Sequence, residues 1–75
     1  MKIGATSIVS IRGGVLDHVI TYSEDTIMSE VYGEFSRILR EENVPQDEID
    51  DAINRDGYSA ENGEFDLLIY YTTRE

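Results

Sequence analysis

The one histidine of the chain, His18, stands next to a carboxylate, Asp17. A histidine oriented by a carboxylate is a common general base, and a nearby serine would complete a nucleophilic site. Successive residues of a strand point to opposite faces, so this pair can act together only if a bulge breaks the alternation. In addition, no serine stands in a G-x-S-x-G turn between a strand and a helix. We therefore expect no catalytic site and predict that the protein is not an enzyme.

Metal and cofactor chemistry finds equally little support in the sequence. The stretch from Asn54 to Gly57 is similar to part of an EF-hand calcium loop, but aligning Gly57 with the loop glycine places Ala52 and Gly63 where carboxylates are required. The pair Gly13–Gly14 lacks the lysine and the following helix of a phosphate-binding loop. The chain has no cysteine, which excludes disulfides and thiolate metal sites. We expect neither a metal nor a cofactor.

The charge balance is the most distinctive feature of the composition. Six basic residues face sixteen acidic ones, giving a net charge of −10, which disfavours direct binding to nucleic acid or to an anionic membrane. Ten of the acids lie between Glu41 and Asp66, where Arg55 is the only base. Such carboxylates either form an ordinary solvated surface or imitate the phosphates of a nucleic acid and inhibit its binding protein. Small phage-encoded inhibitors use the second device, and this chain resembles them in size and charge alone. The residues concerned would be Asp47, Glu48, Asp50 and Asp51.

Two helices are predicted, and the second of them carries these four acids. An apolar arc at helical spacing marks residues 27–39, with Ser23 as the expected N-cap and Asn43 and Pro45 beyond the C-terminal end. The arc consists of Ile27, Met28, Val31, Tyr32, Phe35, Ile38 and Leu39. The opposite side, which includes Ser36, is expected to face solvent. A second, short helix is predicted from Pro45 to about Asn54.

Three strands are predicted, at residues 3–11, 15–22 and 65–73. Gly13 and Gly14 suit a tight turn between the first two strands. If Arg12 lies opposite Val15 and the pairing continues without interruption, the hairpin separates into two faces. The face expected beneath the long helix carries Ala5, Ser7, Val9, Ile11, Leu16, His18, Ile20 and Tyr22, and the other carries Thr6, Ile8, Ser10, Arg12, Asp17, Val19 and Thr21.

These elements predict an α+β fold of the order β-β-α-α-β. The third strand most simply pairs with the first, so the sheet order is 2-1-3, with one long and one short helix packed on one face. A chain of 75 residues has room for one domain, at residues 1–75. No apolar run suits a signal peptide or a membrane span, and we expect a cytoplasmic protein.

The face of the sheet without helices is the predicted binding surface. It is expected to carry Ile8, Val19, Leu68 and Tyr70, which come from all three strands. A contiguous exposed apolar patch usually marks an interface. The sequence therefore favours a small acidic module that binds a protein partner or forms a homodimer through this face, with the nucleic-acid mimic as the alternative function.

Overall fold

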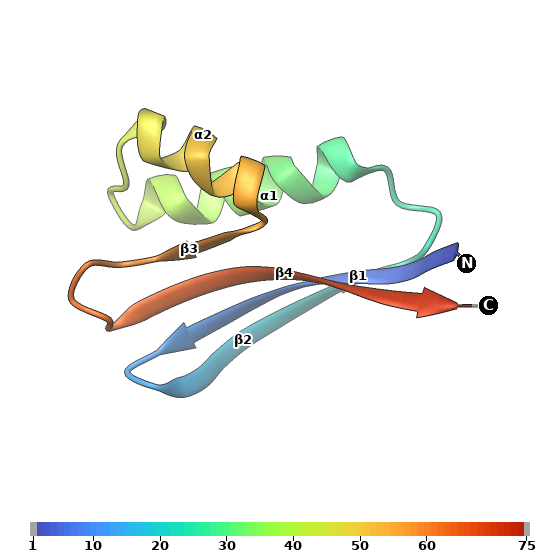
Figure 1. Ribbon diagram of the computed structural model, residues 1–75, viewed down its shortest axis with the longest axis horizontal. Coiled ribbons are helices and arrows are strands. Elements are labelled where there is room, and N and C mark those ends of the chain that lie inside the picture. The colour runs from blue at the N-terminus through green and yellow to red at the C-terminus, as the bar shows by residue number, and fades with distance from the viewer. Residues whose placement is uncertain (1, 75) are drawn as a thin grey trace.

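The computed structural model describes the backbone of residues 2–74 and the side chains of residues 5–71. It is an α+β fold in which two helices lie over a four-stranded antiparallel sheet (Figure 1). The elements in chain order are β1 (Lys2–Arg12), β2 (Val15–Tyr22), α1 (Met28–Glu41), α2 (Gln46–Arg55), β3 (Gly57–Ser59) and β4 (Phe65–Arg74). The two helices and three of the strands are where the sequence predicts them. β3 lies in a stretch that was predicted to be a loop.

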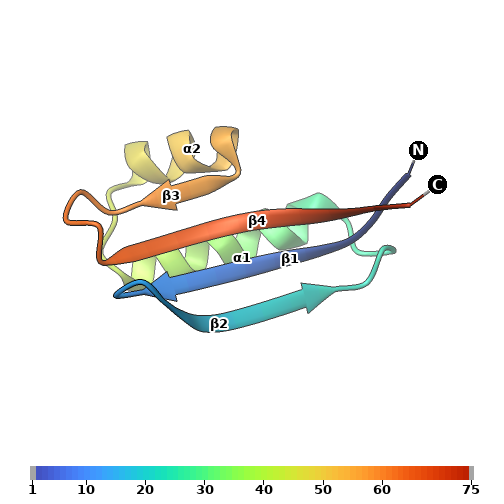
Figure 2. The ribbon, with the colours of Figure 1, turned by 60° about the horizontal axis from the view of Figure 1, so that its bottom comes forward.

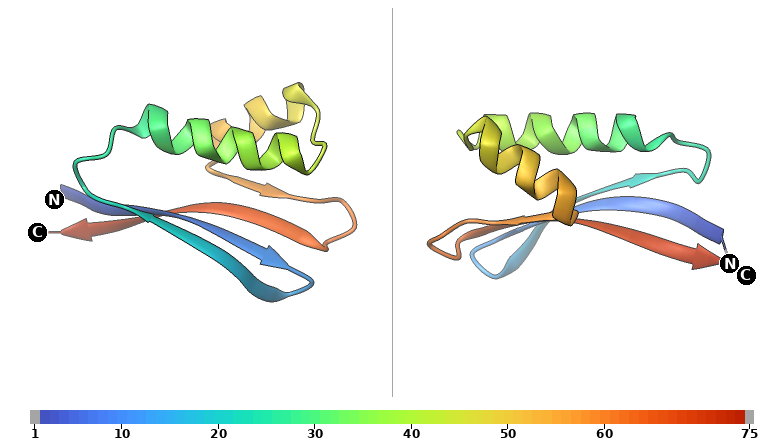
Figure 3. Two further views of the ribbon diagram at one scale, coloured as in Figure 1. Left: turned by 180° about the vertical axis from the view of Figure 1, so that it is seen from behind. Right: turned by 45° about the horizontal axis from the view of Figure 1, so that its top comes forward.

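The strands are ordered β2-β1-β4-β3, and every neighbouring pair is antiparallel. This arrangement confirms the predicted order for the three long strands and adds β3 at the edge. Both helices lie on the same side of the sheet, as the views from behind and from above show (Figure 3). The opposite side is left without a covering layer by the described residues.

The ends of α1 are only partly as predicted. Ile27 occupies the N-cap position without a side-chain hydrogen bond, so the prediction that Ser23 caps the helix is wrong. Ser23 instead closes a turn before the helix, in which the Thr26 N–H donates to its carbonyl oxygen at 3.0 Å. After α1, Asn43 adopts the expected left-handed conformation with φ of 64°.

The passage from α2 to β3 depends on Asp56 and Gly57. Asp56 ends α2 in the left-handed conformation, with φ of 55°. Gly57 then lies opposite Leu68 of β4, and a Cβ atom at Gly57 would be only 3.1 Å from the Leu68 Cδ2 atom. The absence of a side chain at this position therefore lets β3 approach β4.

A β-bulge in β2 divides the register of the hairpin. Next to the turn, Ile11 lies opposite Leu16, as predicted. Beyond this pair the register shifts, because Ser10 lies opposite His18 and Asp17 is left as the additional residue. The uninterrupted pairing that the sequence analysis assumed is therefore wrong beyond Leu16.

A shift of one residue exchanges the two faces of a strand. In β1, the residues that point toward the helices are Thr6, Ile8, Ser10 and Arg12, whereas Ser7, Val9 and Ile11 point to the uncovered side. The predicted assignment of β1 was therefore reversed. Ile8 in particular is 1% exposed and belongs to the core, so its predicted place on the uncovered face is wrong.

The core lies between the sheet and the two helices. It consists of Ile8, Val31, Phe35, Leu39, Ile49, Ala52, Phe65, Leu67 and Ile69. The buried side of α1 differs from the predicted one at two positions. Ile27, at the N-cap, is exposed, and Ser36, within the helix, is buried. The buried side of α1 is thus rotated toward the side that carries Val31 and Leu39.

Candidate interaction surface

The uncovered side of the sheet is the candidate interaction surface, and we call it the open face. Figure 2 looks onto the sheet from this side, with the strands in front of α1. Because paired residues share a face, the register places there Ser7, Val9, Ile11, Leu16, Val19, Thr21, Asp66, Leu68 and Tyr70. Most of these side chains are apolar.

The apolar side chains of the open face form one continuous area across three strands. Its centre is a row in which Val9 lies opposite Val19 on one side and Leu68 on the other. Val19 is 43% exposed and Tyr70 is 54% exposed. Leu16, which pairs with Ile11 at the turn end of the sheet, is 62% exposed. Side chains of this type at neighbouring positions, without a covering layer, are typical of a surface that contacts another molecule.

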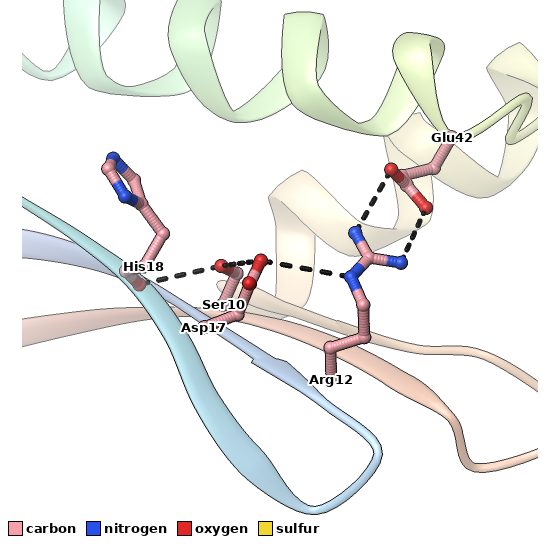
Figure 4. A network of polar contacts seen from close by, with 5 residues as sticks. All are labelled: Ser10, Arg12, Asp17, His18 and Glu42. Atoms are coloured by element: carbon pink, nitrogen blue, oxygen red, sulfur yellow. Dashed lines mark hydrogen bonds and ion pairs between the residues drawn. The ribbon is translucent and has the colours of Figure 1, made fainter.

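Asp66 is the only charged side chain that the described residues contribute to the open face. The bulge accounts for this, because it turns Asp17 away. The Asp17 carboxylate lies on the helix side, where the Ser10 hydroxyl donates to its Oδ2 atom at 3.4 Å and the Arg12 Nε atom lies 3.7 Å from the same oxygen (Figure 4). Bulges are known to redirect side chains in this way.

On the helix side, Arg12 ties the hairpin to the end of α1. Its Nη1 and Nη2 atoms donate to the two carboxylate oxygens of Glu42 at 3.3 and 3.2 Å, and its guanidinium lies 4.7 Å from the centre of the Phe65 ring. The hydrogen bonds to Glu42 raise the pKa of Arg12 above its ordinary value. The Arg12 side chain therefore links the end of β1 to the C-terminal end of α1.

The bulge also brings the His18 and Asp17 side chains, together with Ser10, to the same side of the sheet. His18 points to the helix side, like Asp17 and Ser10, at the margin of a cleft of about 320 Å³ between β2 and α1 (Figure 4). The Ser10 hydroxyl lies 3.4 Å from both the Asp17 Oδ2 atom and the main-chain carbonyl oxygen of His18, so these two acceptors share its one proton. Among the described residues no hydrogen bond reaches the imidazole. A nucleophilic serine needs its hydroxyl proton directed at a base. The geometry directs it to a carboxylate and a carbonyl oxygen instead.

A second polar cluster was not found from the sequence. The carboxylate of Asp56 accepts hydrogen bonds from the hydroxyls of Tyr32 and Tyr71, each at 2.9 Å, and the two hydroxyls lie 3.4 Å apart. Partial burial, followed by these hydrogen bonds, raises the pKa of Tyr71 above its ordinary value. The cluster connects α1, the end of α2 and β4.

The acidic residues of the alternative function lie on α2, on the side of the molecule away from the open face. Asp47, Glu48, Asp50 and Asp51 are all exposed, and Asp50 accepts a hydrogen bond from Gln46 at 2.9 Å. The side chains that α2 buries are Ile49 and Ala52. The apolar and the acidic surfaces are therefore on opposite sides of the fold.

Three of the four residues predicted for the binding surface lie on the open face, namely Val19, Leu68 and Tyr70. Ile8 does not, whereas Val9, Ile11 and Leu16 do, although they were predicted on the face beneath the long helix. The signal that would have found them is the position of the bulge, since it decides which of the adjacent residues Ile8 and Val9 is buried.

Comparison with protein-family models, with curated proteins and with solved structures gives no match to this chain. Among its described residues, none of the helices has the length and apolar character that crossing a membrane requires.

Proposed function

We propose that this chain is a non-enzymatic protein-binding module and that the open face is the surface through which it binds. The observation that carries this proposal is the combination of continuous apolar side chains and, among the described residues, a single carboxylate, Asp66, on a sheet face that neither helix covers (Figure 1). In water such a face is costly, and burying it against another protein recovers free energy in proportion to the apolar area.

The contacts on the helix side support the same proposal. Arg12, Asp17 and Glu42 satisfy one another, and the Asp56 carboxylate is satisfied by two tyrosines. These groups stabilise the fold from the helix side, and among the described residues no ion pair or side-chain hydrogen bond involves the open face.

Site-specific photocrosslinking tests the proposal. A benzophenone amino acid replaces Tyr70 on the open face, and a control carries it at Arg40, which is exposed on α1. After irradiation in an extract of the native host, we expect a discrete protein adduct from position 70 and none from position 40. No adduct from position 70, or the same adducts from both positions, would contradict the proposal.

A second candidate function, mimicry of a nucleic acid, is favoured by one observation. All four carboxylates of α2 are exposed on one short, rigid element that carries a single base, Arg55. Carboxylates spaced along such an element can occupy a cationic groove.

Charge removal on α2 tests this second candidate. The variant Asp47→Asn, Glu48→Gln, Asp50→Asn, Asp51→Asn should lose the ability to displace host DNA-binding proteins from immobilised duplex DNA at low salt. The control Glu24→Gln with Asp25→Asn neutralises two carboxylates outside α2 and should displace as much as the parent. If the parent protein displaces nothing, or if the α2 variant displaces as much as the parent, mimicry is excluded.

A further inference from the structure

The occupant of the open face follows from its size, its charge and its boundary. We infer that it is a second copy of this chain, so that two sheets pack face to face in a symmetric dimer. This inference rests on the proposed function, because it names the partner of the same surface.

The area of the open face is that of a small, stable interface. The chain extends over 38 × 25 × 17 Å, and in the view down the shortest axis the helices lie above the twisted sheet (Figure 1). The longest and shortest extents therefore approximate the footprint of the sheet. These dimensions give a face of roughly 650 Å² per copy, or about 1,300 Å² for two copies, which lies within the standard range for stable protein interfaces. The area of the open face is therefore close to the lower limit for a stable dimer, so nearly all of the face would be buried.

The distribution of charge also suits a face-to-face dimer. Two chains with a charge of −10 each repel one another unless their acids are kept apart. In a face-to-face dimer the α2 carboxylates lie on the two outer surfaces, separated by about twice the 25 Å thickness of one copy. This separation is several times the Debye length of about 10 Å at 0.1 M salt. The bulge contributes by removing Asp17 from the face.

The open face suits a second copy better than a different, basic protein. A basic partner would be attracted to the acidic helical side, and the open face provides no charge pattern that would select it. A second copy presents the same apolar centre, around Val9 and Val19, and the same polar margin, which includes Thr21 and Asp66. A symmetric dimer needs a surface that is complementary to itself, and two twisted sheets pack in this way in β-sandwiches.

Two lysine substitutions on β2 form a matched test. Val19→Lys places a charge in the centre of the open face, whereas Val15→Lys makes the same change in net charge at a residue that shares the face of Arg12 and is 67% exposed. Both substitutions make the chain less negative, so general repulsion decreases in both. A loss of association that is confined to Val19→Lys must therefore come from burial of the new charge.

Sedimentation equilibrium from about 10 µM to about 1 mM covers the affinities of small interfaces. We expect the parent and Val15→Lys to dimerise, with association that strengthens as salt screens the remaining repulsion, and Val19→Lys to weaken dimerisation at least tenfold while its circular dichroism stays that of the parent. If Val19→Lys unfolds, Tyr70→Lys makes the same comparison at another exposed residue of the open face.

A parent chain that stays monomeric at 1 mM, or a dimer that Val19→Lys and Tyr70→Lys leave intact, overturns the inference. The crosslinking experiment separates this failure from failure of the proposed function. An adduct from position 70 whose mass is not that of two chains would leave the binding module standing with a different partner, whereas the absence of any adduct would remove both.

Discussion

Tyr71→Phe removes one hydroxyl from the cluster around Asp56 and leaves the shape of the side chain almost unchanged. The hydroxyl donates to a carboxylate oxygen at 2.9 Å and lies 3.4 Å from the Tyr32 hydroxyl. Asp56 keeps the hydrogen bond from Tyr32, so the carboxylate is not left without a partner. The substitution therefore measures one hydrogen bond between β4 and the end of α2.

The magnitude follows from the charge of the acceptor. A hydrogen bond to an ionised group contributes about 1.5–3 kcal/mol, and the partial exposure of Tyr71 places it near the lower value. For a chain of 75 residues the whole free energy of unfolding is about 4–11 kcal/mol. A loss of about 1.5 kcal/mol lowers the melting temperature of a domain of this size by about 6–12 °C.

Tyr70→Phe is the matched control for this experiment. Tyr70 is the preceding residue of the same strand, but its side chain is on the open face and forms no hydrogen bond among the described residues. Urea unfolding of both variants at low protein concentration should show a change of less than about 0.5 kcal/mol for Tyr70→Phe. Equal stabilities of the two variants would refute the role assigned to the Asp56 cluster.

Three further predictions concern the pH dependence, the register and the long helix. The pKa of Tyr71 is raised in the folded state, so as the pH rises the Tyr71 hydroxyl loses its proton in the unfolded chain first. The free energy of unfolding should therefore fall above about pH 10. Urea unfolding between pH 8 and 11 should show a less steep fall for Tyr71→Phe. Ile8→Ala should cost about 2–5 kcal/mol and Val9→Ala less than about 1.5 kcal/mol, because Ile8 is 1% exposed and Val9 only partly buried, and similar losses would contradict the shifted register. Gly33→Ala should raise the free energy of unfolding by about 0.5–1 kcal/mol, since a Cβ atom meets nothing within 4 Å; a loss in thermal unfolding would indicate that the backbone is approached there.

The general form of the fold could be predicted because its signals are periodic. The apolar spacing in α1, the two glycines of the hairpin turn and the alternation in β4 each have one simple interpretation. With a helix between β2 and the last long strand, the order of the three long strands follows from the rules for connections. The four-stranded sheet was only partly predicted, because β3 has three residues and no alternation can be recognised over that length.

The faces of the hairpin could not be predicted in full, and the reason is local. Ile8 and Val9 are adjacent apolar residues, as are Val19 and Ile20, so either member of each pair can be buried. The choice depends on whether Asp17 is counted in the ladder. Its ion pair with Arg12 and its hydrogen bond from Ser10 on the helix side accompany the bulge, and such contacts become visible only in three dimensions.

Three residues of the open face could nevertheless be predicted from the sequence. Val19, Leu68 and Tyr70 lie on the open face, because their positions in β2 and β4 do not change with the assignment of β1. The Asp56 cluster was missed because its three members are far apart in the sequence, and only the folded chain brings their oxygen atoms together.

The most direct test of the account is to measure whether water reaches the open face at high protein concentration. Paramagnetic relaxation by a soluble gadolinium complex reports the solvent exposure of individual methyl groups in solution. The account predicts that the methyl groups of Val19 and Leu68 become protected as the concentration rises, while those of Val15, on the same strand as Val19, stay exposed. Equal relaxation of the three residues at all concentrations would contradict the claim that this face is a binding surface for a second copy.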